Sequence, residues 1–115
     1  VMALSRTRLT EKVINVSAAS TAGIVTVTSS KKVFVKSVIL HNVSTATTTR
    51  SHLYYVPNGD SVSDNNRLFD VSIEPQETVY IEPAYPITLT TTGDTVSIGA
   101  TSAQVNVFIN GDKES

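Results

Sequence analysis

The sequence of 115 residues has no cysteine and no tryptophan, and a single methionine. The lack of cysteine excludes a disulfide framework, a thiolate zinc site and a cysteine nucleophile. No run of about 20 apolar residues is present, and residues 1–12 lack the apolar centre of a signal peptide. We therefore expect neither a membrane span nor an export segment, and the length predicts one domain.

Strong helix formers are scarce or scattered, whereas valine, isoleucine and threonine together make 40 of the 115 residues. Branched side chains lose rotamer freedom in a helix and pack well on a pleated sheet, so we expect an all-β chain. Disorder is the alternative explanation for 14 serines and 16 threonines. The regular alternation of apolar and polar residues argues against it.

Alternating segments separated by turn signals predict eight or nine short strands, at residues 13–17, 24–28, 33–43, 52–56, 68–73, 78–81, 87–91, 96–100 and 105–109. The second and third are expected to form a hairpin around the sequence SSKK. Residues 33–43 have apolar residues at both parities, which is typical of a central strand covered on both faces. The pattern predicts a single antiparallel β-sandwich, jelly-roll-like or immunoglobulin-like, and leaves that choice open.

The chain is expected to divide into an extended N-terminal arm at residues 1–12, a sandwich at 13–111 and a frayed tail at 112–115. Charge is uneven along it, with a net charge of +6 in residues 1–50 and −7 in residues 51–115. Pairing of opposite charges across neighbouring strands within one chain is the simpler explanation. Contact of the basic part with an acidic partner, or with another copy, is the alternative.

Two groups of residues are candidates for metal binding. His41 and His52 lie on consecutive predicted strands where they could approach each other, but no third ligand stands at a suitable spacing. The loop at residues 57–67 holds oxygen donors that suit either a calcium site or ordinary turns: Asp60, Asp64, Asn65 and Asn66. Turn formation is the simpler explanation, so we expect no metal.

No catalytic constellation is recognisable in the sequence. The chain has no GxSxG motif and no glycine-rich phosphate loop. The carboxylate pairs Glu74 with Glu77 and Asp60 with Asp64 fall in predicted turns, where solvated acids are the rule. We therefore expect neither an enzyme nor a cofactor.

The remaining candidates are basic and aromatic surface residues. Lys31, Lys32 and Lys36 form a compact basic cluster that either protects a strand edge from aggregation or contacts a partner. Tyr54 and Tyr55 either stack on sugars or pack in the sheet. The tyrosines do not stand beside the lysines in the sequence, so nucleic-acid binding is not expected.

Five segments occur in a recognisable order: KKVFVKSVILHN (31–42), LYYVPNGDSVSDNN (53–66), IEPQETV (73–79), ITLTTTGDT (87–95) and VNVFING (105–111). In this order, and over residues 12–111, the chain resembles small β-sandwich structural proteins of tailed-phage virions. The resemblance implies a non-enzymatic virion component. A capsid decoration or cement protein fits best, one that binds the outside of the shell and bridges capsomers. Neck, tail and fibre-base modules are similar at this level.

This resemblance implies a homo-oligomer, with a trimer favoured, that is assembled in the host cytoplasm and binds the major capsid protein or other virion proteins, without nucleic acid or membrane. The expected contacts with acidic capsid surface, or between subunits, are basic residues of the arm and of the lysine cluster: Arg6, Arg8, Lys31, Lys32 and Lys36. The competing hypothesis is a host-glycan-binding tip domain that uses Tyr54, Tyr55 and the loop at residues 57–67.

Overall fold

The computed structural model describes residues 4–10 and 13–114, and of residues 4–8 it describes the backbone. The described residues contain one short 3₁₀ turn, η1 (Asp64–Asn66), and otherwise only strands and loops. The strands are β1 (Leu4–Arg8), β2 (Ile14–Val16), β3 (Ser20–Thr26), β4 (Val33–Asn42), β5 (Thr49–Val56), β6 (Arg67–Ile73), β7 (Thr78–Ile81), β8 (Ile87–Leu89), β9 (Thr95–Ala100) and β10 (Val105–Glu114). The all-β prediction is confirmed, with nine strands after residue 13.

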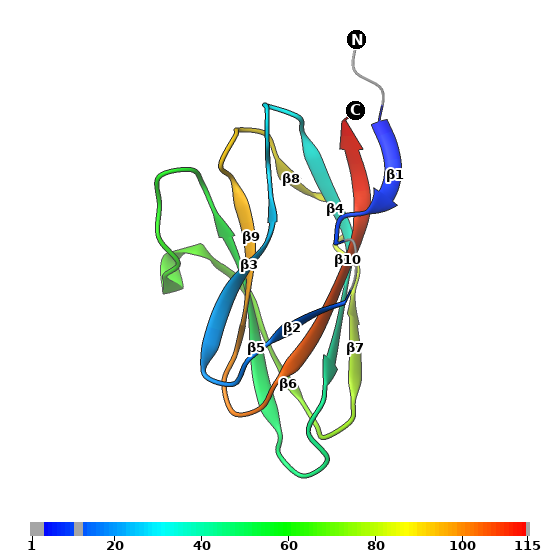
Figure 1. Ribbon diagram of the computed structural model, residues 1–115, viewed down its shortest axis with the longest axis vertical. Coiled ribbons are helices and arrows are strands. Elements are labelled where there is room, and N and C mark those ends of the chain that lie inside the picture. Colours follow the sequence, from blue (N-terminus) through cyan, green and yellow to red (C-terminus); the bar gives the residue numbers. More distant parts are fainter. Residues whose placement is uncertain (1–3, 11–12, 115) are drawn as a thin grey trace.

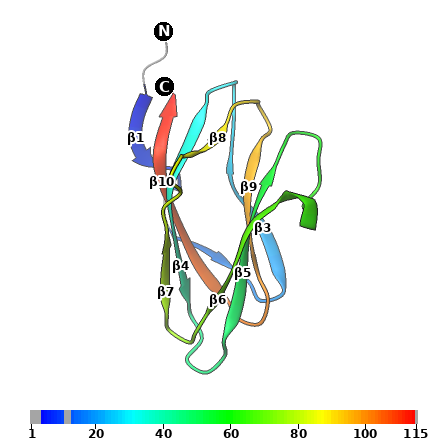
Figure 2. The ribbon, with the colours of Figure 1, turned by 180° about the vertical axis from the view of Figure 1, so that it is seen from behind.

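The strands form two antiparallel sheets that pack face to face, seen from opposite sides in Figures 1 and 2. Sheet A has the order β1-β10-β4-β7, with β2 also paired to β10 and β8 also paired to β4. Sheet B has the order β3-β9-β5-β6. The predicted antiparallel sandwich is therefore confirmed, and β4 lies at the centre of sheet A as expected.

Strand pairs are nested along the chain. β2 pairs with β10, β3 with β9, β4 with β7, and β5 with β6, and the pairs alternate between sheets A and B. This arrangement, a long hairpin rolled into two sheets, is the jelly roll. In an immunoglobulin sandwich the first two strands share a sheet, whereas β2 and β3 lie in different sheets. The structure thus decides between the two predicted topologies.

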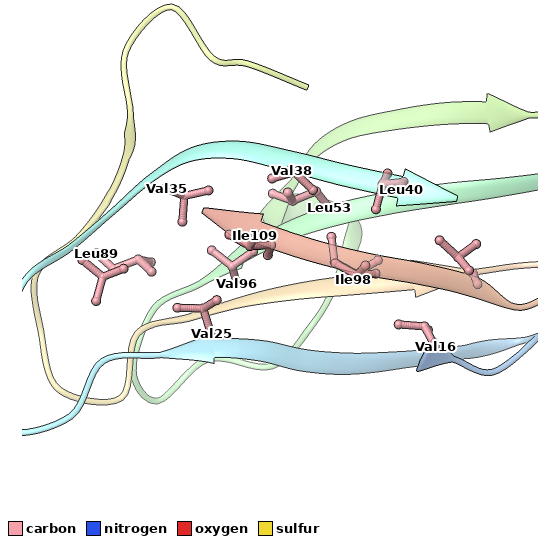
Figure 3. Close-up of a cluster of buried hydrophobic side chains, with 14 of the residues drawn as sticks. Val16, Val25, Val35, Val38, Leu40, Leu53, Leu89, Val96, Ile98 and Ile109 are labelled. Atoms are coloured by element: carbon pink, nitrogen blue, oxygen red, sulfur yellow. The ribbon is translucent and has the colours of Figure 1, made fainter. Parts of the chain in front are cut away.

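The hydrophobic core fills the space between the sheets with aliphatic side chains (Figure 3). Val38 and Leu40 from sheet A meet Leu53 and Ile98 from sheet B, and all four are fully buried. Burial of one such side chain contributes about 1.5–3 kcal/mol. The alternation of small branched residues that predicted the strands is therefore also what holds the two sheets together.

A β-bulge at Lys36 changes the side that β4 turns to the core. Val35 pairs with Gly111 of β10 and Ser37 pairs with Asn110, so Lys36 has no partner in the ladder. Val35 faces the core before the bulge and Val38 faces it after the bulge, although their positions differ in parity. The prediction that β4 is covered on both faces was wrong. Its apolar residues at both parities result from the bulge.

The expected hairpin around SSKK is not formed. β3 pairs with β9 in sheet B, and β4 belongs to sheet A, so residues 27–32 cross from one sheet to the other. β3 also begins earlier than predicted, at Ser20. The physical reason is that nested long-range pairing leaves neighbouring strands in opposite sheets, and local turn signals do not carry that information.

Both ends of the chain pair with each other in sheet A. β1 runs antiparallel to the last part of β10, with Leu4 opposite Glu114 and Arg8 opposite Asn110 (Figure 1). The backbone N–H of Glu114 also donates to the carbonyl of Lys32, at 3.0 Å. Residues 4–8 of the predicted arm are therefore an edge strand, and residues 112–114 of the predicted tail are not frayed. The physical reason is that each end supplies the other's backbone hydrogen bonds.

We predict that Gly111→Ala lowers the free energy of unfolding by about 3 kcal/mol or more. A Cβ atom at Gly111 would overlap the carbonyl oxygen of Phe34, which is backbone and cannot turn aside. Gly23→Ala is the matched control, because its Cβ would meet only side-chain atoms, the Cγ2 of Thr95 at 3.2 Å and the Oγ of Ser97 at 3.9 Å. Urea unfolding of both variants checks this. An equal loss of unfolding free energy in the two variants would contradict the role given to the bulge.

Candidate functional site

The outer face of sheet B is polar, and its charges are paired. Arg50 on β5 donates from Nε and Nη2 to the two carboxylate oxygens of Asp70 on β6, at 3.2 and 2.8 Å. These hydrogen bonds, opposed by burial and helped by nearby positive charge, hold the pKa of Asp70 below its ordinary value. The prediction that opposite charges pair across strands is confirmed here, and again where Lys36 Nζ lies 2.7 Å from Asp112 Oδ2.

A histidine links this ion pair to a buried tyrosine. His52 Nε2 lies 3.2 Å from Asp70 Oδ1, and His52 Nδ1 lies 3.2 Å from the hydroxyl of Tyr54. Beside it, the Arg67 guanidinium lies 5.7 Å from the centroid of the Tyr54 ring and bonds Asp64 at 2.7 Å. Most of these groups bond to one another across β5 and β6, although the buried Nε of Arg67 has no hydrogen-bond partner.

The outer face of sheet A is apolar at its centre. Phe108 on β10 stands opposite Ile39 on β4, and Ile39 stands opposite Tyr80 on β7. Ile39 and Phe108 are half-buried, and Tyr80 is 68% exposed. We call these three residues the apolar row. Antiparallel sheets usually turn polar side chains outward, so an apolar row across three strands distinguishes this face from an ordinary solvent-exposed one.

Polar side chains border the apolar row on both sides and bond to one another. On one side, Asn15 Nδ2 donates to Asn106 Oδ1 at 3.0 Å, and His41 Nδ1 lies 2.8 Å from Thr78 Oγ1. On the other side, the Asn110 amide donates to the Ser37 hydroxyl, at 3.4 Å. Because these groups already have partners, covering them costs less than covering unpaired polar groups. An apolar centre with a satisfied polar rim is the anatomy of a protein interface.

A shallow groove of about 170 Å³ runs beside the apolar row. It is lined by residues of β4 and β10 together with one residue before β2: Val13, Ile39, His41, Asn106, Val107 and Phe108. Val13 is 54% exposed, which extends the apolar surface toward the edge of the sheet. The row and the groove form one continuous patch, and we take it as the candidate site.

The predicted basic contacts fall in or next to strands of sheet A. Lys32 directly precedes β4, and Lys36 lies within β4, the strand that also carries Ile39 of the apolar row. Lys36 is already paired with Asp112. Arg6 and Arg8 lie in β1 beside β10, and their side chains are outside what the structure describes.

The predicted tyrosine pair is not an exposed platform. Tyr54 is 6% exposed on the outer side of β5, and Tyr55 lies against the core, where its hydroxyl donates to Asp94. The two strongly exposed tyrosines are Tyr80 and Tyr85, at 68% and 88%. Of the two roles considered for Tyr54 and Tyr55, the structure shows packing in the sheet.

The histidine pair considered as a metal site is not brought together. His41 lies on the outer face of sheet A and His52 on the outer face of sheet B, because consecutive strands β4 and β5 belong to different sheets. That candidate was wrong. Within residues 4–10 and 13–114, no three His, Asp or Glu side chains are placed to hold a metal ion.

Asp94 ties two loops and strand β5 together at one end of the sandwich, and it is 3% exposed. Its oxygens accept backbone N–H bonds from Thr91, Asn58 and Thr90 at 3.0, 3.0 and 3.3 Å, and the Tyr55 hydroxyl at 3.3 Å. Burial raises the pKa of this carboxyl, but the four donors together outweigh burial and lower it. The sequence predicted only a turn between the strands at 87–91 and 96–100. An Asp directly after a turn glycine is nevertheless a signal for a carboxylate that accepts nearby backbone N–H groups.

Comparison with known proteins shows the fold. The chain is similar to a subunit of Bacillus endospore appendages, described as disulfide-linked pili, with a TM-score of 0.54, 15% identity, and coverage of 100% of this chain and 90% of that one. Two weaker similarities have a TM-score of 0.47 each. One is to a chain of the cyanophage Pam1 capsid asymmetric unit (15% identity, 98% of this chain and 85% of that one), and the other is to a chain of the virus-like particle of the giant freshwater prawn Macrobrachium rosenbergii extra small virus (14% identity, 100% and 82%).

Neither a family model nor a curated protein matches the sequence. The similarity to the appendage subunit lies at low identity, so it supports the β-sandwich fold alone, and the function has to be argued from the surface. Among the described residues, no helix has the length and apolarity needed to span a membrane.

We predict that Asp94→Asn lowers the free energy of unfolding at pH 7 by about 2 kcal/mol, because backbone donors lose a charged acceptor. Since the folded-state pKa lies below the ordinary value of 3.8, the wild type keeps this contribution above about pH 4 and loses it as the pH falls further. The Asp94→Asn variant should therefore lose less free energy of unfolding than the wild type as the pH falls. Asp60→Asn, in an exposed loop, is the control, and chemical unfolding from pH 7 to pH 3 is the measurement.

Proposed function

We propose that this protein is a non-enzymatic structural component of an assembled particle, and specifically a capsid decoration or cement protein of a tailed-phage virion. One observation carries the proposal: the two outer faces of the sandwich are unequal. Sheet B closes its outer face with its own ion pairs, whereas sheet A turns an apolar row outward inside a satisfied polar rim. A surface of this composition is built to be covered by protein.

The partner that fits this face is an acidic patch on the capsid shell. Lys31 and Lys32 stand where the chain enters β4, and the same strand carries Ile39 of the apolar row. β1, which contains Arg6 and Arg8, lies in the same sheet. Cations at one end of a face that carries an apolar centre steer a partner of opposite charge and fix its orientation. In this proposal the apolar row supplies affinity, and the basic residues supply orientation.

The fold is compatible with such a role. Jelly rolls occur in viral capsid proteins and in lectins, so topology alone supports both an assembly role and a recognition role. The endospore appendage subunit, which has a similar fold, belongs to a pilus, a structure assembled from many copies. Neck, tail and fibre-base positions in a virion would use the same face in the same manner.

A glycan-binding tip domain is the second candidate, and one observation favours it. A groove of about 470 Å³ at the end of the sandwich opposite Asp94 is lined by small uncharged side chains: Ala18, Val43, Ser44, Thr45, Thr47, Ser102, Ala103 and Gln104. Hydroxyls and an amide suit the hydroxyls of a neutral sugar. This groove replaces the buried Tyr54 and Tyr55 as the place to test with a glycan array.

We predict that Tyr80→Ser weakens binding to empty shells at least about tenfold, because the most exposed ring of the apolar row is lost. The fold should be unaffected, since Tyr80 is 68% exposed. Tyr85→Ser is the matched control, with a ring that is 88% exposed and lies outside the row. Co-sedimentation with shells gives both affinities. Unchanged binding of Tyr80→Ser would rule out the apolar row as the contact.

We predict that the double change Lys31→Glu and Lys32→Glu slows association with shells and reduces the dependence of binding on salt. Charges at the rim of an interface act mainly on the rate of encounter. Surface plasmon resonance at two ionic strengths measures this. The corresponding change Arg6→Gln and Arg8→Gln tests β1 separately, and wild-type kinetics in both variants would contradict the assignment of these basic residues.

A further inference from the structure

We propose that β6 pairs with β6 of a second copy about a two-fold axis at Val71, so that two B sheets join into one continuous sheet. This inference rests on the proposed function in one respect, because it states how copies of a structural subunit join. It uses a different surface from the apolar row. β6 is the last strand of sheet B and lies on the near side of the molecule in Figure 2.

The other sheet edges in the described residues are interrupted. In sheet A, the edge made by β7 and β8 is broken by Pro83 and Pro86, and the opposite edge changes from β1 to β2. In sheet B, β3 has a bulge at Ile24 in the second half of the strand. Prolines, bulges and short strands are the usual devices that prevent edge pairing.

The β6 edge has a regular segment of five residues. Its bulge, at Leu68, lies near the beginning of the strand and leaves residues 69–73 in unbroken register with β5. Phe69, Val71 and Ile73 turn toward the core, and Asp70 and Ser72 turn outward. Apolar and branched residues in alternation suit a strand with a neighbour on each side. This segment therefore offers the longest uninterrupted free edge in sheet B.

Charge and register select the position of the two-fold axis. An axis at Asp70 would place two carboxylates opposite each other, and an axis at Ser72 would place Asp70 opposite Glu74. An axis at Phe69 would bring the bulge at Leu68 into the new ladder. An axis at Val71 avoids all three conflicts, because it sets Phe69 opposite Ile73 and Asp70 opposite Ser72 of the second copy.

Arg50 makes this register complementary in charge. Its side chain crosses from β5 to Asp70 on β6, and it remains 58% exposed. Ser72 is the residue of β6 that pairs with Arg50. With the axis at Val71, Asp70 of the second copy stands opposite Ser72, beside the exposed guanidinium. Each Arg50 then lies between two carboxylates, one from each copy, which is a favourable arrangement for a guanidinium with several donors.

Cysteine cross-linking tests the register directly, because the chain has no cysteine of its own. Val71→Cys lies on the proposed axis, where facing Cα atoms are close enough for a disulfide. Under mild oxidation, we expect the yield of covalent dimer from Val71→Cys to be at least about tenfold higher than from Thr21→Cys. Thr21 lies on the β3 edge, where only random collisions between molecules would form a disulfide. A mixture of Asp70→Cys and Ser72→Cys chains should cross-link more than either variant alone.

Light scattering of the unmodified protein gives the second measurement. The proposal expects twice the 12.3 kDa of one chain, whereas the resemblance favours a trimer. Cross-linking of Val71→Cys no higher than that of Thr21→Cys would overturn the inference. If such a protein still sedimented with shells, only the β6 contact would fail and the proposed function would stand. A cross-linked dimer that ignored shells would support the β6 contact and remove the proposed function.

Discussion

The bulge at Lys36 is the constraint on which the surface of this protein depends. Before the bulge, odd-numbered residues of β4 face the core, and after it even-numbered residues do, so Ile39 and His41 turn outward. The bulge is possible because Gly111 leaves room for the backbone at Phe34. Without the bulge, one half of β4 would place its apolar residues in solvent. A single glycine thus sets both the core and the outer face of sheet A.

The two outer faces then serve different purposes. On sheet B, Arg50, His52 and Asp70 pair with one another across β5 and β6. On sheet A, the row through Ile39 has satisfied polar neighbours and an unpartnered apolar centre. Asp94 ties the loops together at one end of the two sheets. A sandwich with one polar outer face and one apolar outer face is compatible with the proposal that the protein binds to an assembly through sheet A.

Much of the fold could be predicted from the sequence, because alternation of valine, isoleucine and threonine reports strands directly. The positions of β4, β6 and β7 were close to those observed. The nested pairing was not predictable, since it depends on contacts between distant residues, such as Leu4 with Glu114. The apolar row was missed for the same reason: Ile39, Tyr80 and Phe108 become neighbours only through strand order and the bulge. Local patterns gave no sign that the strands holding His41 and His52 lie in different sheets.

The most direct test of the central claim is a cryo-EM reconstruction of cognate empty shells saturated with the protein. The account predicts added density for the sandwich on the outside of the shell, with sheet A toward the shell and Phe108, Ile39 and Tyr80 in the contact. A reconstruction without added density, or one in which the outer face of sheet A points to solvent, would contradict it.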